Sequence, residues 1–335
     1  MTYPPSDHYD GKHFFNPEPT TRQISGQRNG TLALLRARLG RDPAEWARWP
    51  RHLPNHPHPV PADGFSNLTF IGHSTFLLRL PGLTILTDPI FSSRCSPSRF
   101  IGPKRVRAPS IALASLPHVD IILVSHNHYD HMDLPSLRLL RKRFPSAEIV
   151  TTLGNAPYLE KKRLHAAREL DWWQSINLFG AHITATPARH FSARTLQDRN
   201  RTLWGGFYID YQGHKIYFAG DTGYTRFFSI IRERLGAPDL ALLPIGAYEP
   251  RWFMGPVHMN PADATQAFID LQAKRGVGMH FGTFQLTAEG IDAPLHDLAI
   301  ARAQAGISPN AFTALDIGET TSLEPMADQV QACIG

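Results

Sequence analysis

One short stretch restricts the fold of this chain more than any other feature. The apolar run "IILV" at residues 121–124 is followed at once by "SHNHYDH". An unbroken apolar run of this length is typical of a strand that is buried on both faces. A cluster of histidines and an aspartate directly after it is costly inside a protein unless a cation compensates it. The sequence therefore predicts a core strand that ends at a metal site, in preference to a polar turn with solvated histidines.

The spacing within this stretch suggests how the side chains divide between ions. Because side chains alternate as a strand ends, His126 and His128 point the same way and can reach one cation. Asp130 and His131 follow once the chain turns, so we expect them to face a neighbouring position. Imidazole and carboxylate ligands suit zinc, and also iron or manganese.

Three other apolar runs end in residues of the same kind. "TPARH" ends in His190, "YFAGD" ends in Asp221 and "GVGMH" ends in His280. Each one alone is explained equally well by ordinary packing. All three stand at expected strand ends beside small residues, and one segment cannot complete two metal sites. We therefore expect them to join the first cluster.

The pattern of apolar runs predicts sheets covered by helices. Residues 1–60 are expected to form an extension that packs on a main domain at 61–335, with helices over 31–39 and 43–49. In the main domain, strands are expected within 68–80, 83–91, 119–125, 147–152, 181–191, 203–212, 214–221, 239–248 and 275–284. Helices are expected over 134–144, 225–236 and 260–274, the last capped by Asn260 with Pro261 in its first position.

Composition narrows the expected location and partners. The net charge of +5 is spread along the chain without a dense basic block, so no nucleic-acid partner is expected. The charge permits an anionic substrate and contact with an anionic lipid surface. Two distant cysteines predict neither a disulfide framework nor a cysteine-rich zinc site. No secretory signal or membrane-spanning run is evident, so we expect a cytoplasmic protein, with peripheral membrane contact and a homodimer left open.

The motif H-x-H-x-D-H, followed by a distant His, Asp and His, resembles the metallo-β-lactamase-fold hydrolases. The phrases "IGHSTFLL", "LTDPIFSSRCSP", "FAGDTGY" and "LPIGAYEPRWFM" are most similar to N-acyl-phosphatidylethanolamine-hydrolysing phospholipase D and its bacterial relatives in the RomA/UlaG-like group. The resemblance covers about residues 65–290. It implies an α/β fold, the four-layer αββα sandwich, with metals at one edge of two packed sheets.

The resemblance also implies a ligand set and an activity. Two divalent ions are expected, with Zn²⁺ the best fit and Fe or Mn left open. One would be held by His126, His128 and His190, the other by Asp130, His131 and His280, with Asp221 between them. A hydroxide shared by the metals, which Asp130 also orients, would hydrolyse N-acyl-phosphatidylethanolamine or a related phospholipid. A lactone hydrolase and a metal-binding regulatory protein without turnover are the alternatives.

Further residues are expected around the metals. Asp88 could orient a ligand histidine or form only an Asp-Pro turn, and His73 could do the same or pack as a core histidine. In the related phospholipases, the position that His258 matches lies near the substrate and assists catalysis, so His258 is expected to do the same, with an ordinary loop histidine as the alternative. Substrate contacts are expected from "EPRWFM", whose guanidinium suits phosphate and whose rings suit acyl chains, although core packing explains the rings equally well: Arg251, Trp252 and Phe253. Arg194 is a weaker phosphate candidate, with a solvated surface position favoured.

Overall fold

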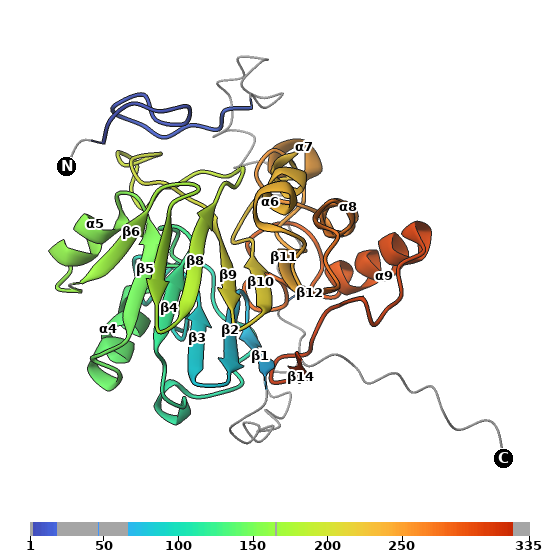
Figure 1. Cartoon of the computed structure of the whole chain (residues 1–335), viewed down its shortest axis with the longest axis horizontal. Helices are drawn as coiled ribbons and strands as arrows, with labels where there is room; N and C mark the ends of the chain where they lie inside the picture. The colour runs from blue at the N-terminus through green and yellow to red at the C-terminus, as the bar shows by residue number, and fades with distance from the viewer. Residues whose placement is uncertain (1–2, 19–45, 47–65, 165, 324–335) are drawn as a thin grey trace.

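Two seven-stranded sheets form the centre of the computed structural model, which describes residues 3–18, 46, 66–164 and 166–323 (Figure 1). The first sheet has the order β14-β1-β2-β3-β4-β5-β6. Its strands are β1 (Asn67–Gly72), β2 (Thr75–Leu80), β3 (Leu83–Thr87), β4 (Ile121–Val124), β5 (Glu148–Thr152), β6 (Ala167–Leu170) and β14 (Thr320–Ser322).

The second sheet has the order β13-β12-β11-β10-β9-β8-β7. Its strands are β7 (Ser175–Leu178), β8 (Ala181–Thr186), β9 (Gly206–Tyr211), β10 (His214–Phe218), β11 (Leu240–Pro244), β12 (Arg275–Met279) and β13 (Phe312–Thr313). Along the described chain, strands β1 to β6 of the first sheet thus precede every strand of the second sheet, and β14 follows them all.

Helices cover the outer face of each sheet, so the predicted αββα sandwich is confirmed. The helices are α4 (Leu134–Arg143), α5 (Asn155–Lys161), α6 (Phe227–Leu235), α7 (Arg251–Met254), α8 (Pro261–Leu271) and α9 (Ala293–Ala305), with a short 3₁₀ turn η1 (Leu113–Ser115). Leu137 of α4 packs on the first sheet, whereas Phe228 of α6 and Leu298 of α9 pack on the second. No described helix is both long and apolar enough to cross a bilayer.

Strand β4 is buried on both faces, as its sequence predicts. Ile121 and Leu123 point into the core between the sheets, which also contains Phe207 of β9. Ile122 and Val124 point the other way, into the cluster beneath α4. The loop that follows β4 therefore starts from a strand fixed on both sides.

Strand direction brings the polar strand ends together. Strands β3, β4 and β5 run parallel, so their carboxyl ends share one edge of the first sheet. In the second sheet, β8 and β10 both run antiparallel to β9, and β10, β11 and β12 are mutually parallel. The carboxyl ends of β8, β10 and β12 consequently lie at one edge as well. The two edges meet where the His280 amide donates to the His73 carbonyl at 2.8 Å.

Helix α8 begins where the sequence predicts. The Asn260 side chain accepts from the Asp263 amide, and Asp263 accepts in return from the Asn260 amide, which forms a capping box. Elements without a prediction are β6, β7, β13, β14, α5, α7 and α9. The strand expected over 275–284 ends at Met279, and α9, β13 and β14 follow it along the chain.

The extension is described in part. Residues 3–18 pack on the main domain through Tyr9 and Phe14, which are buried with Trp172 and Trp204. The helices predicted over 31–39 and 43–49 lie outside the described residues except for Trp46, whose indole donates to the Glu289 carbonyl at 3.0 Å. The boundary near residue 60 stays a prediction.

Candidate metal centre

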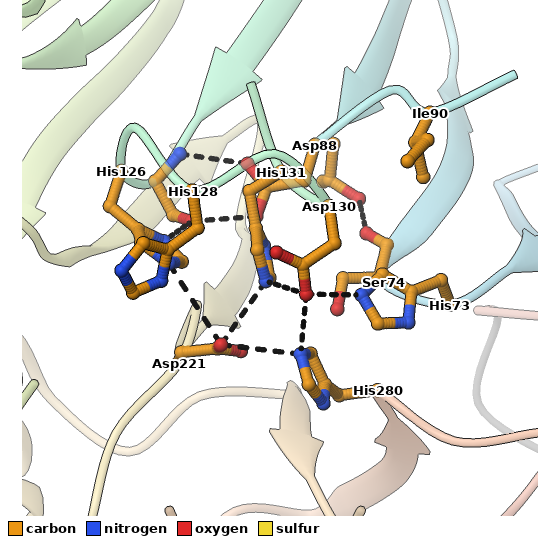
Figure 2. Close-up of polar contacts among 12 residues, drawn as sticks. His73, Ser74, Asp88, Ile90, His126, His128, Asp130, His131, Asp221 and His280 are labelled. Atoms are coloured by element: carbon orange, nitrogen blue, oxygen red, sulfur yellow. Dashed lines mark hydrogen bonds and ion pairs between the residues drawn. The ribbon is translucent and has the colours of Figure 1, made fainter. Parts of the chain in front are cut away.

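The predicted ligands from both sheets converge at the shared edge (Figure 2). The loop after β4 supplies four of them, and the segments after β8, β10 and β12 supply one each. The complete set is His126, His128, Asp130, His131, His190, Asp221 and His280. The structure thus brings together every residue predicted as a ligand.

Three imidazoles and a carboxylate form the first donor group. Nδ1 of His128 lies 2.8 Å from Nε2 of His126 and 3.2 Å from Nε2 of His190. Oδ2 of Asp221 lies 3.9 Å from Nε2 of His126 and 3.7 Å from Nε2 of His190. Atoms bound to one tetrahedral Zn²⁺ at about 2.0–2.1 Å lie about 3.4 Å from one another, so this spacing fits a single ion.

The second donor group shares the same carboxylate. Oδ2 of Asp221 is 3.1 Å from Nε2 of His131 and 3.2 Å from Nε2 of His280. Oδ2 of Asp130 is 3.4 Å from Nε2 of His131 and 3.3 Å from Nε2 of His280. Asp221 is the one predicted ligand whose oxygen lies within 4 Å of nitrogen atoms in both groups, within the described residues.

Close packing holds Asp221 in place. Its neighbour Gly220 has φ +60, and a Cβ there would lie 2.7 Å from the Gly205 carbonyl oxygen and 2.8 Å from the Ser125 Cβ. Glycine is the residue that tolerates both this backbone conformation and this approach. The segment after β10 therefore sits directly against the start of the loop after β4.

Buried polar atoms without hydrogen bonds test whether these residues fit a metal. Among the described residues, Oδ1 of Asp221 and Nε2 of His131 are buried and have no hydrogen-bond partner. Buried atoms of this kind are rare unless an ion or water completes them. Together with the spacing and the imidazole–carboxylate donor set, they fit a pair of divalent cations.

The imidazoles of the first group are held neutral. Burial lowers the pKa of His126 well below its ordinary value, that of His128 to about 4 and that of His190 to about 3. A histidine binds a metal only in its neutral form, because the lone pair must be free. These three side chains are therefore in the ligating state at neutral pH.

The second group balances charge differently. Burial opposes ionisation of Asp221 and Asp130, but the histidines beside them hold the pKa of each carboxyl well below its usual range. Burial likewise opposes a charge on His131 and His280, but the carboxylates raise the pKa of His131 well above 6.5 and that of His280 to about 9. A divalent cation would take the place of these protons.

Asp88 lies behind the ligands, where it can orient them. Its Oδ2 accepts from Nδ1 of His131 at 2.6 Å and from the Ser125 hydroxyl at 2.6 Å, and its Oδ1 accepts from the Ser125 amide at 2.7 Å. The Ser125 hydroxyl also lies 2.9 Å from Nδ1 of His126. One buried carboxylate is thus linked to a histidine in each donor group, and such contacts fix ring orientation.

His73 lies closer to the centre than its sequence context suggests. Its Nε2 is 3.0 Å from Oδ2 of Asp130, and its ring centroid is 4.2 Å from that of His280. Burial lowers the pKa of His73 to about 3. The side chain therefore contacts the second donor group directly, beside Asp130 (Figure 2).

His258 lies beside Asp221, among the predicted ligands. Its Nε2 is 4.0 Å from Oδ2 of Asp221, and its ring centroid is 5.0 Å from that of His190. Its Nδ1 is buried and lacks a hydrogen-bond partner among the described residues. Burial lowers the pKa of His258 to about 3, so the ring is neutral at physiological pH.

The "EPRWFM" residues lie next to His258. Arg251 donates to the His258 carbonyl at 3.0 Å and to Asp263 at 2.5 Å. Trp252 is 62% exposed, and its ring meets that of Phe253 edge-on with centroids 5.6 Å apart. Arg251 is thus already engaged by protein groups, whereas Trp252 presents its ring to solvent.

Arg194 has a position that its sequence context did not indicate. The prediction that favoured a solvated surface position for Arg194 was wrong, because the residue is only 9% exposed. Its Nη1 donates to the carbonyls of Asn127 at 2.6 Å and Met132 at 2.9 Å, and the guanidinium lies 3.9 Å from the centroid of the Tyr129 ring. Arg194 therefore holds the loop that carries four predicted ligands. No local sequence signal reveals a contact across 62 or more residues.

Comparison with known proteins places these residues in a family. The profile of the Beta-lactamase superfamily domain matches residues 84–281. An uncharacterized protein of Mycobacterium tuberculosis is 41% identical over 240 residues, which are 70% of this chain and 63% of that protein. The chain thus spans less than two thirds of the length of that relative.

Two further similarities concern activity and fold. N-acyl-phosphatidylethanolamine-hydrolyzing phospholipase D 1 of Caenorhabditis elegans is 35% identical over 279 residues, which are 78% of each protein. The structure of a metallo hydrolase from the archaeon Ignicoccus hospitalis superposes with a TM-score of 0.56 at 23% identity, covering 77% of this chain and 98% of that one. At this identity the second similarity concerns the fold alone.

Proposed function

The chain belongs to the β-lactamase superfamily of metal-dependent hydrolases, and from that premise we propose that it is a phosphodiesterase of the phospholipase D type with two metal ions, most suitably Zn²⁺. Its substrate is N-acyl-phosphatidylethanolamine or a related phospholipid. The substrate class follows the Caenorhabditis elegans relative, whose name states that activity.

The position of Asp221 carries the proposal. One oxygen of this carboxylate lies 3.1–3.9 Å from four histidine nitrogens, two in each donor group. A carboxylate in that position can bind both ions and fix their separation. When bound, a pair of divalent cations polarises a phosphoryl oxygen and lowers the pKa of a water toward neutrality.

The protein's own residues then have distinct tasks. Asp221 would set the spacing of the two ions, and Asp130 would be a ligand that also orients the attacking oxygen. Asp88 and His73 hold the ligands from behind. His258 lies close to Asp221, beside the reacting groups, and we assign it the role of proton acceptor on that position.

Residues 251–253 are proposed to line the substrate mouth. Trp252 and Phe253 would meet acyl chains, and the exposed Trp252 ring also suits peripheral contact with lipid. Arg251 would face the phosphate. Because Arg251 already donates to the His258 carbonyl, it links this mouth to the proposed proton acceptor.

The test is metal analysis combined with a hydrolysis screen. Purified protein should contain two equivalents of metal and hydrolyse N-acyl-phosphatidylethanolamine and a simple aryl phosphodiester, but not a lactone. In Asp221→Ala, both sites lose a ligand, so metal content and activity should fall together. Wild-type metal content in that variant would refute the shared carboxylate.

Other outcomes would favour the alternatives. Turnover of the lactone alone would identify a lactone hydrolase. Two bound metals without turnover of any ester would favour a regulatory protein. A single bound metal would exclude the binuclear site.

A further inference from the structure

The N-terminal segment 3–18, called here the strap, crosses one end of the two sheets, where it is drawn in dark blue in Figure 1. At its start, the Tyr3 hydroxyl donates to Glu169 at 2.6 Å and accepts from the Gly154 amide at 2.9 Å. In its middle, the Phe14 amide donates to the Asn200 carbonyl at 2.8 Å. The strap is thus fixed to the first sheet at one end and to the segment after β8 further along.

Near its end, the strap reaches a predicted metal ligand. The Asn16 side-chain amide donates to the His190 carbonyl at 2.9 Å, and the His190 amide donates to Oδ1 of Asn16 at 3.2 Å. These two hydrogen bonds pair Asn16 with the His190 backbone much as one strand pairs with another. The contact spans 174 residues of sequence.

His190 needs such a partner because of where it lies. It is fully buried in the segment between β8 and β9, outside any strand, so no sheet neighbour satisfies its amide and carbonyl. Buried backbone groups are nearly always paired. The ring is fixed separately, since its Nδ1 lies 2.9 Å from the Val257 carbonyl and Nε2 points to the first donor group. Asn16 therefore fixes the backbone from which this ring projects.

Residues on either side of Asn16 anchor it. Phe14 is buried in a cluster with Trp204 and Ala188, and Ala188 stands two residues before His190. Beyond Asn16, Glu18 accepts from the Thr225 hydroxyl at 3.0 Å and pairs with Nε of Arg226 at 2.5 Å. Asn16 is consequently held between two anchored residues, so its side chain can position His190 without being displaced.

We propose that Asn16 is a positioning residue for the donor group of His126, His128 and His190, and that the part of the strap from Phe14 to Glu18 is a working part of the metal centre. This inference rests on the proposed pair of metal ions. It adds to that proposal a residue that touches neither metal nor substrate, in a segment outside the matched family domain. Loss of the Asn16 hydrogen bonds should affect metal binding only at the first donor group, because the second group takes no ligand from the segment after β8.

The experiment measures Zn²⁺ affinity at both sites of the full chain by competition with a chromophoric chelator, and the visible absorption of the Co²⁺-loaded protein. Asn16→Ala should weaken one site by roughly ten- to a hundredfold, the usual effect of losing a group behind a ligand, and leave the other unchanged. The visible absorption of Co²⁺ bound at the site that contains His190 should also change, because the position of that ligand changes. Asn16→Asp keeps the acceptor for the His190 amide but loses the donor to its carbonyl, so it should show the same selectivity if Asn16→Ala does not fold.

Tyr3→Phe is the matched control, because it removes the hydrogen bonds of the strap at its opposite end. It should keep wild-type affinity at both sites. Wild-type affinity in both Asn16 variants would overturn the inference, and so would equal weakening of both sites in all three variants, which would make the strap merely structural. If the wild-type protein took up fewer than two ions, the proposed function itself would fail, and the inference with it.

Discussion

The buried side chain of Arg194 fixes the position of the loop after β4. Its guanidinium is nearly inaccessible, and its hydrogen bonds go to carbonyl oxygens of the loop that follows β4. Hydrogen bonds that involve a charged donor are among the stronger ones in proteins. The positions of His126, His128, Asp130 and His131 therefore depend on a residue that contacts none of the proposed ions.

We predict that Arg194→Met weakens metal binding and destabilises the fold. The Asn127 and Met132 carbonyls would lose their buried donor, which costs about 1–3 kcal/mol for each unsatisfied group. Urea unfolding and chelator competition measure the two effects. Arg201→Met, at an exposed arginine of the same segment, is the control and should change stability by less than about 0.5 kcal/mol. Similar values for both variants would contradict the role of Arg194.

His258 should matter for turnover and not for metal binding. We expect His258→Ala to keep two metal equivalents while kcat falls by about a hundredfold or more, the usual contribution of a proton-transfer group. Elemental analysis and steady-state kinetics on the phosphodiester measure both quantities. An unchanged kcat would remove His258 from the mechanism, and loss of a metal ion would make it a ligand.

The sequence predicted the members of the candidate centre because the ligands stand at or shortly after the ends of apolar runs and match the ligand motif of a known family. His190, Asp221 and His280 were each explained equally well by packing when taken alone, so their assignment depended on their joint occurrence after apolar runs and on the family resemblance. The roles of Asn16 and Arg194 could not be predicted, because their hydrogen-bond partners are backbone atoms of residues distant in sequence. Every residue has these backbone atoms, so the residue types give no sign of the contact. His73 was ambiguous for a related reason, since a buried histidine in a turn looks the same with or without Asp130 beside it.

At the scale of elements, the strap has an anchor that depends on pH. His8 lies 2.7 Å from Asp171 and 2.6 Å from Asp7, and its ring stacks on Trp172 at 4.3 Å. Burial lowers the pKa of His8, but hydrogen bonds and charge from the two carboxylates outweigh this and raise it above 6.5. Protonated His8 therefore stabilises the folded strap.

A raised pKa fixes the sign of the pH effect. The contribution of His8 is complete below pH 6.5, its unfolded value, and is lost as pH rises through the higher folded value. We expect the difference in melting temperature between wild type and His8→Phe to be largest in mildly acidic buffer and to shrink in alkaline buffer. A difference that is constant with pH would refute the charged anchor.

The elements that were predicted and those that were missed differ in their apolar patterns. Strand β4 is an unbroken apolar run, and α8 has a capping box, so both were evident. Strands β6 and β7, "AREL" and "SINL", lie at sheet edges. "AREL" has no apolar alternation, and the alternation in "SINL" involves only two apolar residues, which is too short to predict a strand. Strand β14 has only three residues, "TTS", and takes its structure from pairing with β1.

At the scale of the whole molecule, the donor set joins the two sheets. His126, His128, Asp130 and His131 follow a strand of the first sheet, whereas His190, Asp221 and His280 follow strands of the second. Bound cations would therefore link the sheets at the edge where buried carboxylates would otherwise depend on protonated histidines.

We predict that metal removal lowers the stability of the entire fold. A ligand that binds only the folded state stabilises it by about 4 kcal/mol when present at a thousand times its dissociation constant. Chelated protein should melt at a clearly lower temperature, and added Zn²⁺ should restore it. In Asp221→Ala, added Zn²⁺ should raise the melting temperature of the chelated protein by less than in the wild type. Equal melting curves with and without chelator would contradict the link between the sheets.

The division of the donors between the two sheets also sets an order of events during synthesis. The ribosome releases the histidines of the β4 loop more than a hundred residues before His280. A nascent chain can therefore hold an ion only through an incomplete set, and tight capture must wait until β12 has emerged and joined its sheet. Metal loading is thereby coupled to completion of the polypeptide, so a product that stops before residue 280 would remain without its full complement of ions.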